Sequence, residues 1–254
     1  MTSKNRRYSL DEHASSTRRF GLIPVMLAVS LFIVCFDNNQ FWWTVANTVN
    51  GAEHPRILSL LMFLLLLGGI NVTLALSIGQ RGFKATAAAL LLLASAVGFY
   101  MSKFGIAIDT SLVRSALETD LHKVSALLTL DFLVHVALFG ALPALIVLFL
   151  PMKRCSWKRD LAAKGALIAL SILGPVIAIH ADYLEFSFYG QANRHVRLFM
   201  NPLYPAYATG QYFRELLQSH FKASNALATG SARPLRPEPP EPVAVVTAGR
   251  DGRP

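Results

Sequence analysis

The sequence predicts an all-α polytopic membrane protein with five transmembrane helices, amphipathic helices beyond the bilayer and a disordered C-terminal tail. Of its 254 residues, 53% are hydrophobic and only 15% are charged. Soluble domains carry about a quarter charged residues, so this composition argues against an ordinary soluble protein. Five long apolar runs give the second indication, because a helix of about 20 residues crosses a ~30 Å hydrocarbon core. The predicted spans are 20–36, 57–78, 85–104, 126–150 and 161–179.

Polar residues interrupt or adjoin several of these runs. Residues 37–40 follow the first run, and they either line a cavity or form a wet helix end before the aromatic belt of Phe41, Trp42 and Trp43. Residues 80–84 are predicted to form a tight basic turn between the second and third spans. Asp131 and His135 lie one helical turn apart in the fourth span. We interpret them as a structural or interface pair, with a proton or metal site as the alternative.

The distribution of basic residues predicts how the chain crosses the membrane. Lys and Arg gather in the tail at 1–19, in the turn at 80–84 and in the segment 153–164. The positive-inside rule then places the N-terminus in the cytoplasm, and five spans place the C-terminus in the periplasm of a bacterial inner membrane. The net charge of +9 is therefore assigned to cytoplasmic loops and lipid contact. Because no basic patch is interleaved with aromatic residues, nucleic acid is not an expected partner.

The chain divides into three parts by composition. We expect a cytoplasmic tail over 1–19, a transmembrane domain over 20–222, and a Pro-rich linker or tail over 223–254. The domain ends with an amphipathic helix expected over 203–221 on the outer leaflet. Cys35 and Cys155 lie in or beside different spans and predict neither a disulfide framework nor a thiolate metal site.

The stretch 104–123 between the third and fourth spans is predicted to form a loop or a short helix at the membrane face, and its apolar residues recur at the spacing of an amphipathic helix. Asp109 or Thr110 can cap its start by accepting from free backbone N–H groups. Ser115, Thr119 and Lys123 follow at i, i+4 and i+8, which places them on one line along the polar side. This row either holds a lipid head group or only meets water, and the pattern alone favours the second interpretation.

The order of these features resembles a known family. The third span ends with 99–105 (Phe-Tyr-Met-Ser-Lys-Phe-Gly), followed by Ile108-Asp109 and by 117–120 (Leu-Glu-Thr-Asp). Arg197 and Asn201-Pro202 come later, before a helix and a linker. This order resembles the N-terminal membrane domain of the lipid A phosphoethanolamine transferases, the family of the mobile colistin-resistance enzymes, over roughly residues 20–222.

The resemblance implies an activity that modifies lipopolysaccharide and confers polymyxin resistance. Family members move phosphoethanolamine from phosphatidylethanolamine to lipid A. They use a threonine nucleophile in a Gly-Glu-Thr-Ala-Arg type motif, in a periplasmic domain that holds zinc. This sequence contains no Gly-Glu-Thr-Ala-Arg segment, and its histidines are too scattered to replace the metal ligands. We therefore expect a truncated form that has no catalytic residues, metal or cofactor of its own.

The family also implies which residues contact the lipid substrate. Its loop helix binds lipid through an Asn-x-x-x-Thr-x-x-x-Glu arrangement, and the matching positions here are Ser115, Thr119 and Lys123, of which only the threonine agrees. Lys123 would repel the ammonium of ethanolamine, whereas Glu118 lies one turn from Ser115 and is a substitute carboxylate. These four residues are the predicted substrate-binding set.

Two other functions stay open on the sequence alone. The first is a non-enzymatic inner-membrane protein that binds lipid or regulates a full-length paralogue, which is then its partner. The second is a small transporter, for which Asp131 and His135 are the intramembrane ionisable residues. The sequence shows no inverted repeat, which disfavours a transporter.

Overall fold

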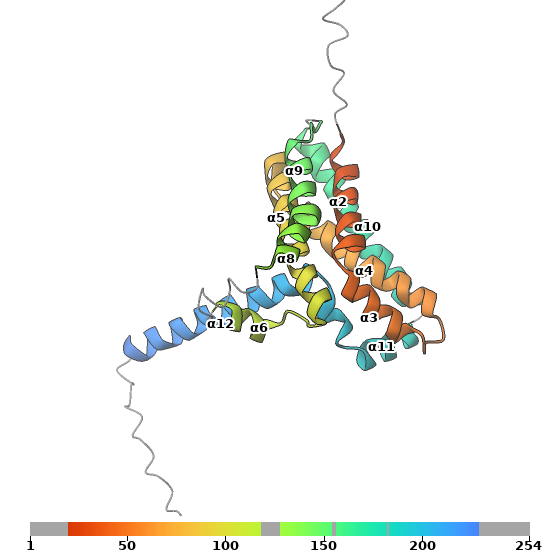
Figure 1. Ribbon diagram of the computed structural model, residues 1–254. Coiled ribbons are helices and arrows are strands. Elements are labelled where there is room, and N and C mark those ends of the chain that lie inside the picture. Colours follow the sequence, from red (N-terminus) through yellow and green to blue (C-terminus); the bar gives the residue numbers. More distant parts are fainter. Residues whose placement is uncertain (1–19, 118–127, 154–155, 182, 229–254) are drawn as a thin grey trace, which may run out of the picture. The chain divides into compact units, whose positions relative to one another are not determined.

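The computed structural model describes residues 20–117, 128–153, 156–181 and 183–228. Within these ranges most residues lie in helices, which Figure 1 labels. The helices are α2 (Leu22–Phe36), α3 (Asn39–Val49), α4 (Pro55–Ala75), α5 (Gly79–Phe104), α6 (Thr110–Leu117), α8 (Leu130–His135), η1 (Val136–Ala141), α9 (Leu142–Phe149), α10 (Trp157–Ala181), α11 (Tyr183–Ala192), η2 (Val196–Phe199) and α12 (Leu203–Ala228). The chain falls into two compact units, Met1–Phe213 and Arg214–Pro254.

The predicted membrane spans are confirmed as helices in the first unit. Four spans are long and apolar enough to cross a bilayer: α4, α5, the continuous segment Leu130–Phe149, and α10. The fifth is the pair α2 and α3, which passes the same test only when both helices are taken together across a bend of 66°. Alone, the 15 residues of α2 reach about 22 Å.

The helix break between α2 and α3 is a buried feature. The sequence allows residues 37–40 to be either a cavity lining or a wet helix end. In the structure, Asp37 and Asn38 are each only 2% exposed, so the wet-end interpretation is wrong for these two residues. Their surroundings are described with the candidate site below.

The basic segment at residues 80–84 is not a turn. α4 ends at Ala75 and α5 already begins at Gly79, which has a φ of +65°. The basic residues Arg81 and Lys84 therefore lie in the first turns of α5. Lys84 Nζ donates to the carbonyl oxygens of Leu148 and Leu150, each at 2.8 Å. A basic side chain thus satisfies the open carbonyl end of α9, which explains why charge is tolerated inside the helix.

The fourth span contains a π-helical turn, η1, between α8 and α9. Pro143 follows directly after it, near the start of α9. Because proline has no N–H and its ring clashes with the carbonyl four residues earlier, a regular α-helical ladder cannot continue there, and a π-turn absorbs the mismatch. The same segment approaches α5 closely: a Cβ on Gly140 would collide with Ser95 Oγ.

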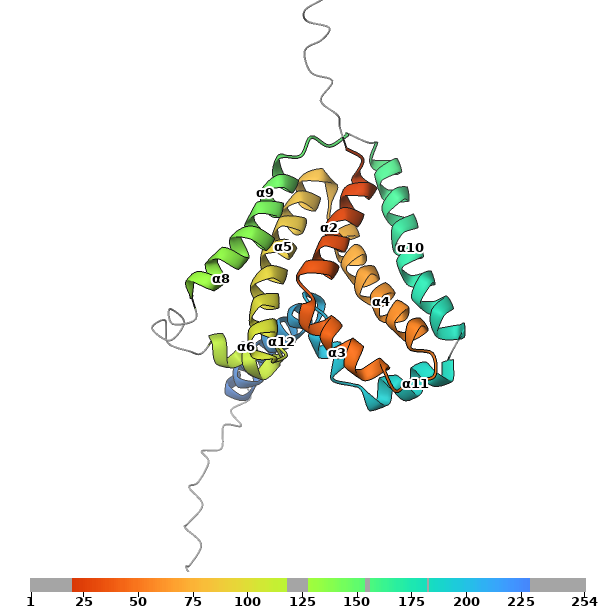
Figure 2. The same cartoon turned by 45° about the vertical axis from the view of Figure 1, so that its right-hand side comes forward.

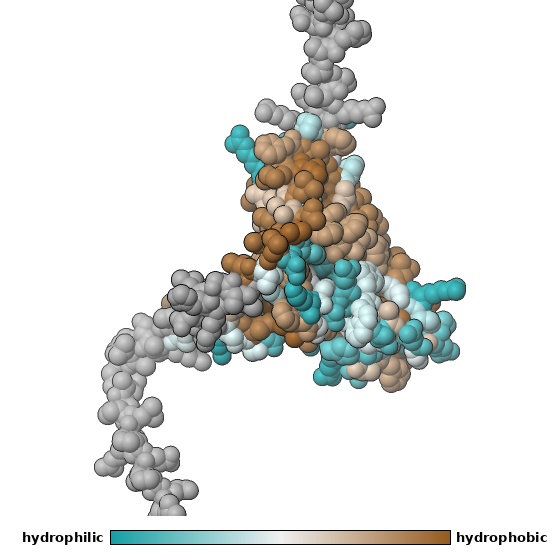
Figure 3. All heavy atoms as spheres, viewed as in Figure 1, coloured by the Kyte–Doolittle hydropathy of each residue, from teal (hydrophilic) through white to brown (hydrophobic). Residues whose placement is uncertain are grey.

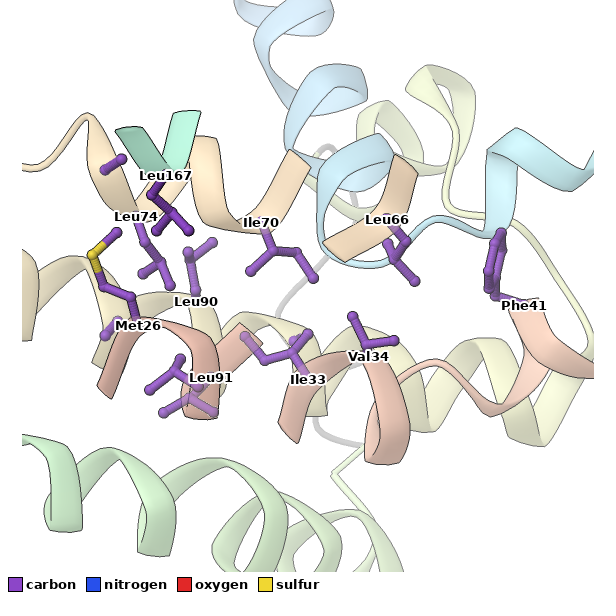
Figure 4. Close-up of a cluster of buried hydrophobic side chains, with 14 of the residues drawn as sticks. Met26, Ile33, Val34, Phe41, Leu66, Ile70, Leu74, Leu90, Leu91 and Leu167 are labelled. Atoms are coloured by element: carbon purple, nitrogen blue, oxygen red, sulfur yellow. The ribbon is translucent and has the colours of Figure 1, made fainter. Parts of the chain in front are cut away.

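The core lies around α2, which packs against α4 and α5. α10 covers α4, while η1 and α9 cover α5. Figure 2 shows α2 between these two pairs. The side chains that fill the centre are almost entirely aliphatic, as Figure 4 shows for Met26, Ile33, Val34, Leu66, Ile70, Leu74, Leu90, Leu91 and Leu167.

The remaining apolar surface belongs to the outer helices. About half of the apolar windows of α4 and α5 are buried (44% and 50%), but only 17% of the windows of Leu130–Phe149 and α10 are buried. Exposed apolar residues therefore cover these outer spans, as expected where helices face lipid rather than protein. In Figure 3 the apolar surface covers the spans, and hydrophilic residues gather around α3 and α11.

Candidate functional site

The predicted capping of the loop helix is confirmed. α6 runs from Thr110 to Leu117, and Asp109 Oδ1 accepts from the backbone N–H of Leu112 at 2.9 Å and from Ser111 Oγ at 2.7 Å. These bonds stabilise the carboxylate, so they hold the pKa of Asp109 below its ordinary value. The start of α6 is therefore fixed by its own sequence. Val113 is the buried residue of this helix.

Of the predicted substrate-binding set, the structure describes one member. Ser115 lies on α6 and is exposed. Glu118, Thr119 and Lys123 lie outside the described residues, so the spacing of the row along a longer helix stays a prediction.

A buried polar junction joins the α2–α3 break to the residue before α12. We define it by Asp37, Asn38 and Asn201, with the backbone of Ala94 and Gly98 on α5. Asn38 Nδ2 donates to the carbonyl of Asn201 at 2.8 Å, and the backbone N–H of Asn201 donates to Asn38 Oδ1 at 3.0 Å. Asn201 Nδ2 donates to the carbonyls of Asp37 at 2.8 Å and Ala94 at 2.6 Å. Two amides thus join three segments distant in sequence.

Close packing against α5 completes the junction. A Cβ on Gly98 would lie 2.6 Å from the carbonyl oxygen of Asp37 and 3.1 Å from Asn201 Nδ2, so only glycine fits. Both carboxylate oxygens of Asp37 and Oδ1 of Asn201 are buried and have no hydrogen-bond partner among the described residues. These acceptors suit a water molecule or another donor group. The hydrogen bonds of the two side-chain amides hold the three segments together, which is a structural role.

Asp131 and His135 do not pair with each other. Asp131 Oδ2 lies 3.3 Å from Lys103 Nζ, and both side chains are substantially exposed. The ring of His135 lies among aromatic rings instead, with centroid distances of 5.4 Å to Phe99 and 4.8 Å to Phe139. The pairing predicted from their spacing is therefore wrong in its partner: Asp131 joins α8 to the end of α5.

A second polar region lies between α3, the following turn and α11. Thr48 Oγ1 and the Tyr189 hydroxyl are 2.7 Å apart, and Glu185 accepts from the backbone N–H of His54 at 2.9 Å. Burial raises the pKa of Tyr189, which the contact with Thr48 partly offsets. Thr48, Glu185 and Tyr189 line a cavity of about 610 Å³ together with Glu53. The contact between α3 and α11 joins residues 141 positions apart, so no local sequence pattern predicts it.

The family resemblance implies zinc, which is held by several His, Cys, Asp or Glu side chains. The described residues contain no group of three or more His, Cys, Asp or Glu side chains that could hold a metal ion.

The chain is similar in sequence to phosphoethanolamine transferases. Phosphatidylethanolamine transferase Mcr-1 of Escherichia coli is 25% identical over 205 residues, which cover 79% of this chain and 37% of that protein. Phosphoethanolamine transferase EptA of Helicobacter pylori is 26% identical over 123 residues, covering 47% of this chain and 24% of that protein. The chain thus spans a little over a third of the length of Mcr-1.

A solved structure shares the fold. The integral membrane protein lipooligosaccharide phosphoethanolamine transferase A (EptA) from Neisseria meningitidis superposes with a TM-score of 0.72 at 18% identity, over 79% of this chain and 38% of that one. The sequence model of the phosphoethanolamine transferase EptA/EptB family matches residues 58–217, from α4 into α12. The chain is therefore a member of the phosphoethanolamine transferase EptA/EptB family, and what it contains is the N-terminal membrane domain of that family.

Proposed function

We propose that this chain is the lipid-docking membrane domain of a phosphoethanolamine transferase, with phosphatidylethanolamine as donor and lipid A as acceptor. The observation that carries the proposal is the family match over residues 58–217. The names of the relatives supply the two substrate classes: one is a phosphatidylethanolamine transferase, and another acts on lipooligosaccharide.

The predicted polar row is the proposed head-group site. In this proposal Ser115, Glu118, Thr119 and Lys123 contact the donor lipid, with Thr119 as the position that agrees with the family pattern. The hydrogen bonds of Asp109 support the proposal because they fix where α6 starts. Ser115 is an exposed residue of that helix.

The proposed orientation places the N-terminus in the cytoplasm of a bacterial inner membrane and the C-terminus in the periplasm. The structure supports it by gathering basic residues at one end of the spans. Arg81 and Lys84 begin α5, whereas Lys158 and Arg159 begin α10. A bundle end rich in Lys and Arg is retained on the cytoplasmic side.

The chemistry itself is proposed to come from outside these residues. The sequence contains no Gly-Glu-Thr-Ala-Arg segment, the motif that the resemblance associates with the nucleophile. We therefore expect the 254-residue chain to bind donor lipid without transferring its head group. A full-length paralogue that supplies zinc-dependent chemistry is the proposed partner.

Donor binding can be tested with the purified chain in detergent micelles and labelled phosphatidylethanolamine. Thr119→Ala should weaken binding about fivefold, because one hydrogen bond contributes about 1 kcal/mol. Thr73→Ala is the matched control, since Thr73 Oγ1 bonds only to the carbonyl of Gly69 within α4. Equal affinity of all three proteins would refute the head-group site.

Transfer is measured on the same protein by adding lipid A and zinc and following phosphoethanolamine on the acceptor. We expect no product from this chain alone. Product formation would refute the proposal that the chemistry comes from elsewhere, while leaving the family assignment unaffected. Specific donor binding that persists without any transfer, even beside a full-length paralogue, would favour the alternative of a non-enzymatic lipid-binding protein.

A further inference from the structure

A cavity of about 660 Å³ lies at the end of the bundle where α2, α5 and α10 begin. Three cationic side chains line it: Arg81 from α5, Lys153 before α10, and Arg159 in α10. It is separate from α6, where the donor head group is proposed to bind, and from the junction around Asn201. None of its lining residues belongs to the predicted head-group set, although Arg81 and Arg159 also support the proposed orientation.

The cations of this cavity are not matched by protein acids. Among the described residues, the side chains of Arg81, Lys153 and Arg159 make no hydrogen bond or ion pair. The one acid in the described lining, Asp160, pairs with Lys164 Nζ at 3.4 Å. The cavity therefore carries an excess of positive charge, which an anion would compensate.

The backbone around the cavity is held in place. The N–H of Lys153 donates to the carbonyl of Phe20 at 2.9 Å, and the N–H of Phe20 donates to the carbonyl of Pro151 at 2.9 Å. The Gln80 side chain also donates to the carbonyl of Lys153. These bonds join the start of α2 to the segment before α10 and to the first turn of α5. The cationic groups thus converge from anchored segments.

The first turns of three helices add to the positive potential. Leu22 and Ile23 of α2, Gly79 and Gln80 of α5, and Trp157 of α10 all line the cavity. No side-chain cap is present at the start of α2 or α5. Free N–H groups and helix dipoles at such ends favour negative charge, so they reinforce the three cations.

An apolar groove next to the cationic cavity indicates which class of anion fits there. Pro24 lines the cationic cavity and also a second cavity of about 480 Å³ between α2, α5 and α9. The second cavity is lined by apolar side chains, including Val25, Phe32 and Leu150. Trp157, 71% exposed at the mouth of the first cavity, is a residue type that sits at the head-group level of membranes. A ligand with an anionic head and an apolar tail matches both cavities.

We propose that this cavity binds the phosphate of an anionic phospholipid, with an acyl chain placed along α2 in the apolar groove. Basic pockets between transmembrane helices are suited to such head groups, and zwitterionic lipids lack the net charge that the three cations attract. In the proposed orientation the lipid belongs to the cytoplasmic leaflet, opposite the donor site.

The test is native mass spectrometry of the 254-residue chain in detergent with equal amounts of phosphatidylglycerol and phosphatidylethanolamine. The wild type should retain phosphatidylglycerol preferentially. Arg81→Gln with Arg159→Gln should lower that retention about tenfold or more, since each cation near a lipid surface contributes about a fivefold factor. Arg56→Gln with Arg194→Gln is the control, because it removes the same charge outside this cavity and should leave the preference unchanged.

Three results would overturn the proposal: no preference for phosphatidylglycerol in the wild type, an equal loss in the control pair, or release of the lipid by millimolar inorganic phosphate. The last would show a free-phosphate site. Should the arginine variants unfold, quenching of tryptophan fluorescence by phosphatidylglycerol with brominated acyl chains tests the same claim. Quenching should fall in Trp157→Phe, and an undiminished signal would contradict the site. Neither readout depends on transferase activity.

Discussion

The two ends of the spans are built with opposite chemistry. At the end where α5 and α10 begin, cationic side chains satisfy helix carbonyls: Lys84 bonds the end of α9, and Lys164 donates to the carbonyl of Ser77 at 2.7 Å. At the other end of α5, neutral amides join the segments instead, through Asn38 and Asn201. Cationic side chains, the buried Lys164 among them, thus make these contacts at one end, and side-chain amides make them at the other.

This difference determines how well each end tolerates the loss of a hydrogen-bond partner. A lysine can move its charge toward water when its partner is lost, because its long stem is flexible. The amide junction has no such freedom, since Asn38 and Asn201 are only 2% and 1% exposed. Substitutions at the amide end should therefore cost more stability than substitutions of single cations at the basic end.

The largest effect is expected at Gly98. Alanine there would place its Cβ 2.6 Å from the carbonyl oxygen of Asp37, and backbone atoms cannot yield cheaply. We expect a loss of about 1–3 kcal/mol in the free energy of unfolding, typical of overpacking. Thermal unfolding in detergent measures it. Gly165→Ala in α10 is the control, because nothing lies within 4 Å of its Cβ position, and it should be neutral or stabilising.

Asn201→Ala should have the next largest effect. It removes both donors to the carbonyls of Asp37 and Ala94 and leaves these acceptors buried, which costs about 1–3 kcal/mol of unfolding free energy. Asn47→Ala is the matched change at an exposed amide that bonds only to the carbonyl of Trp43. Equal destabilisation by the two variants, measured by thermal unfolding, would contradict the special role of the junction.

Lys164→Met sharpens the comparison from the basic end. The side chain is 7% exposed, and the variant loses its bond to the Ser77 carbonyl and its ion pair with Asp160. Methionine retains most of the apolar stem, so we expect a loss of about 1 kcal/mol in unfolding free energy. Lys158→Met, at an exposed position of the same helix, should change the thermal unfolding temperature little. A loss larger than that of Asn201→Ala would reverse the order of the two ends.

The smallest effect is expected for the pair of Lys103 and Asp131. Its side chains are 41% and 78% exposed, and exposed ion pairs contribute at most about 1 kcal/mol. Lys103→Gln should therefore shift the unfolding temperature only slightly, and added salt should reduce the difference further. A salt-independent loss of several degrees would show that this pair is buried in the membrane-embedded protein.

The helical spans could be predicted from the sequence because their apolar runs are long and nearly free of charge. The ends of the helices were harder to predict. The charge of Lys84 indicated a turn, yet this residue lies in α5, where its amine donates to carbonyls at the end of α9. The π-turn before Pro143 also depends on the contact of Gly140 with α5, which no local pattern reveals.

The polar contacts were harder to predict than the spans. The cap at Asp109 is local, and its sequence signal was sufficient. Asn38 and Asn201 are separated by 163 positions, so their pairing depends on the tertiary fold. For Asp131 the local pattern predicted the wrong partner. Helical spacing indicated His135, whereas the carboxylate pairs with Lys103 on a neighbouring helix.

The proposed orientation places the two ends of the spans on opposite sides of the inner membrane. The most direct measurement of this placement is cysteine labelling in intact bacterial cells, after both native cysteines are replaced by serine. Gly190→Cys tests the α11 end, and Ser156→Cys tests the start of α10. A maleimide that cannot cross the inner membrane should label the cysteine at position 190 and not the one at position 156. Labelling at position 156 alone would contradict the account, because the cationic cavity would then face the periplasm.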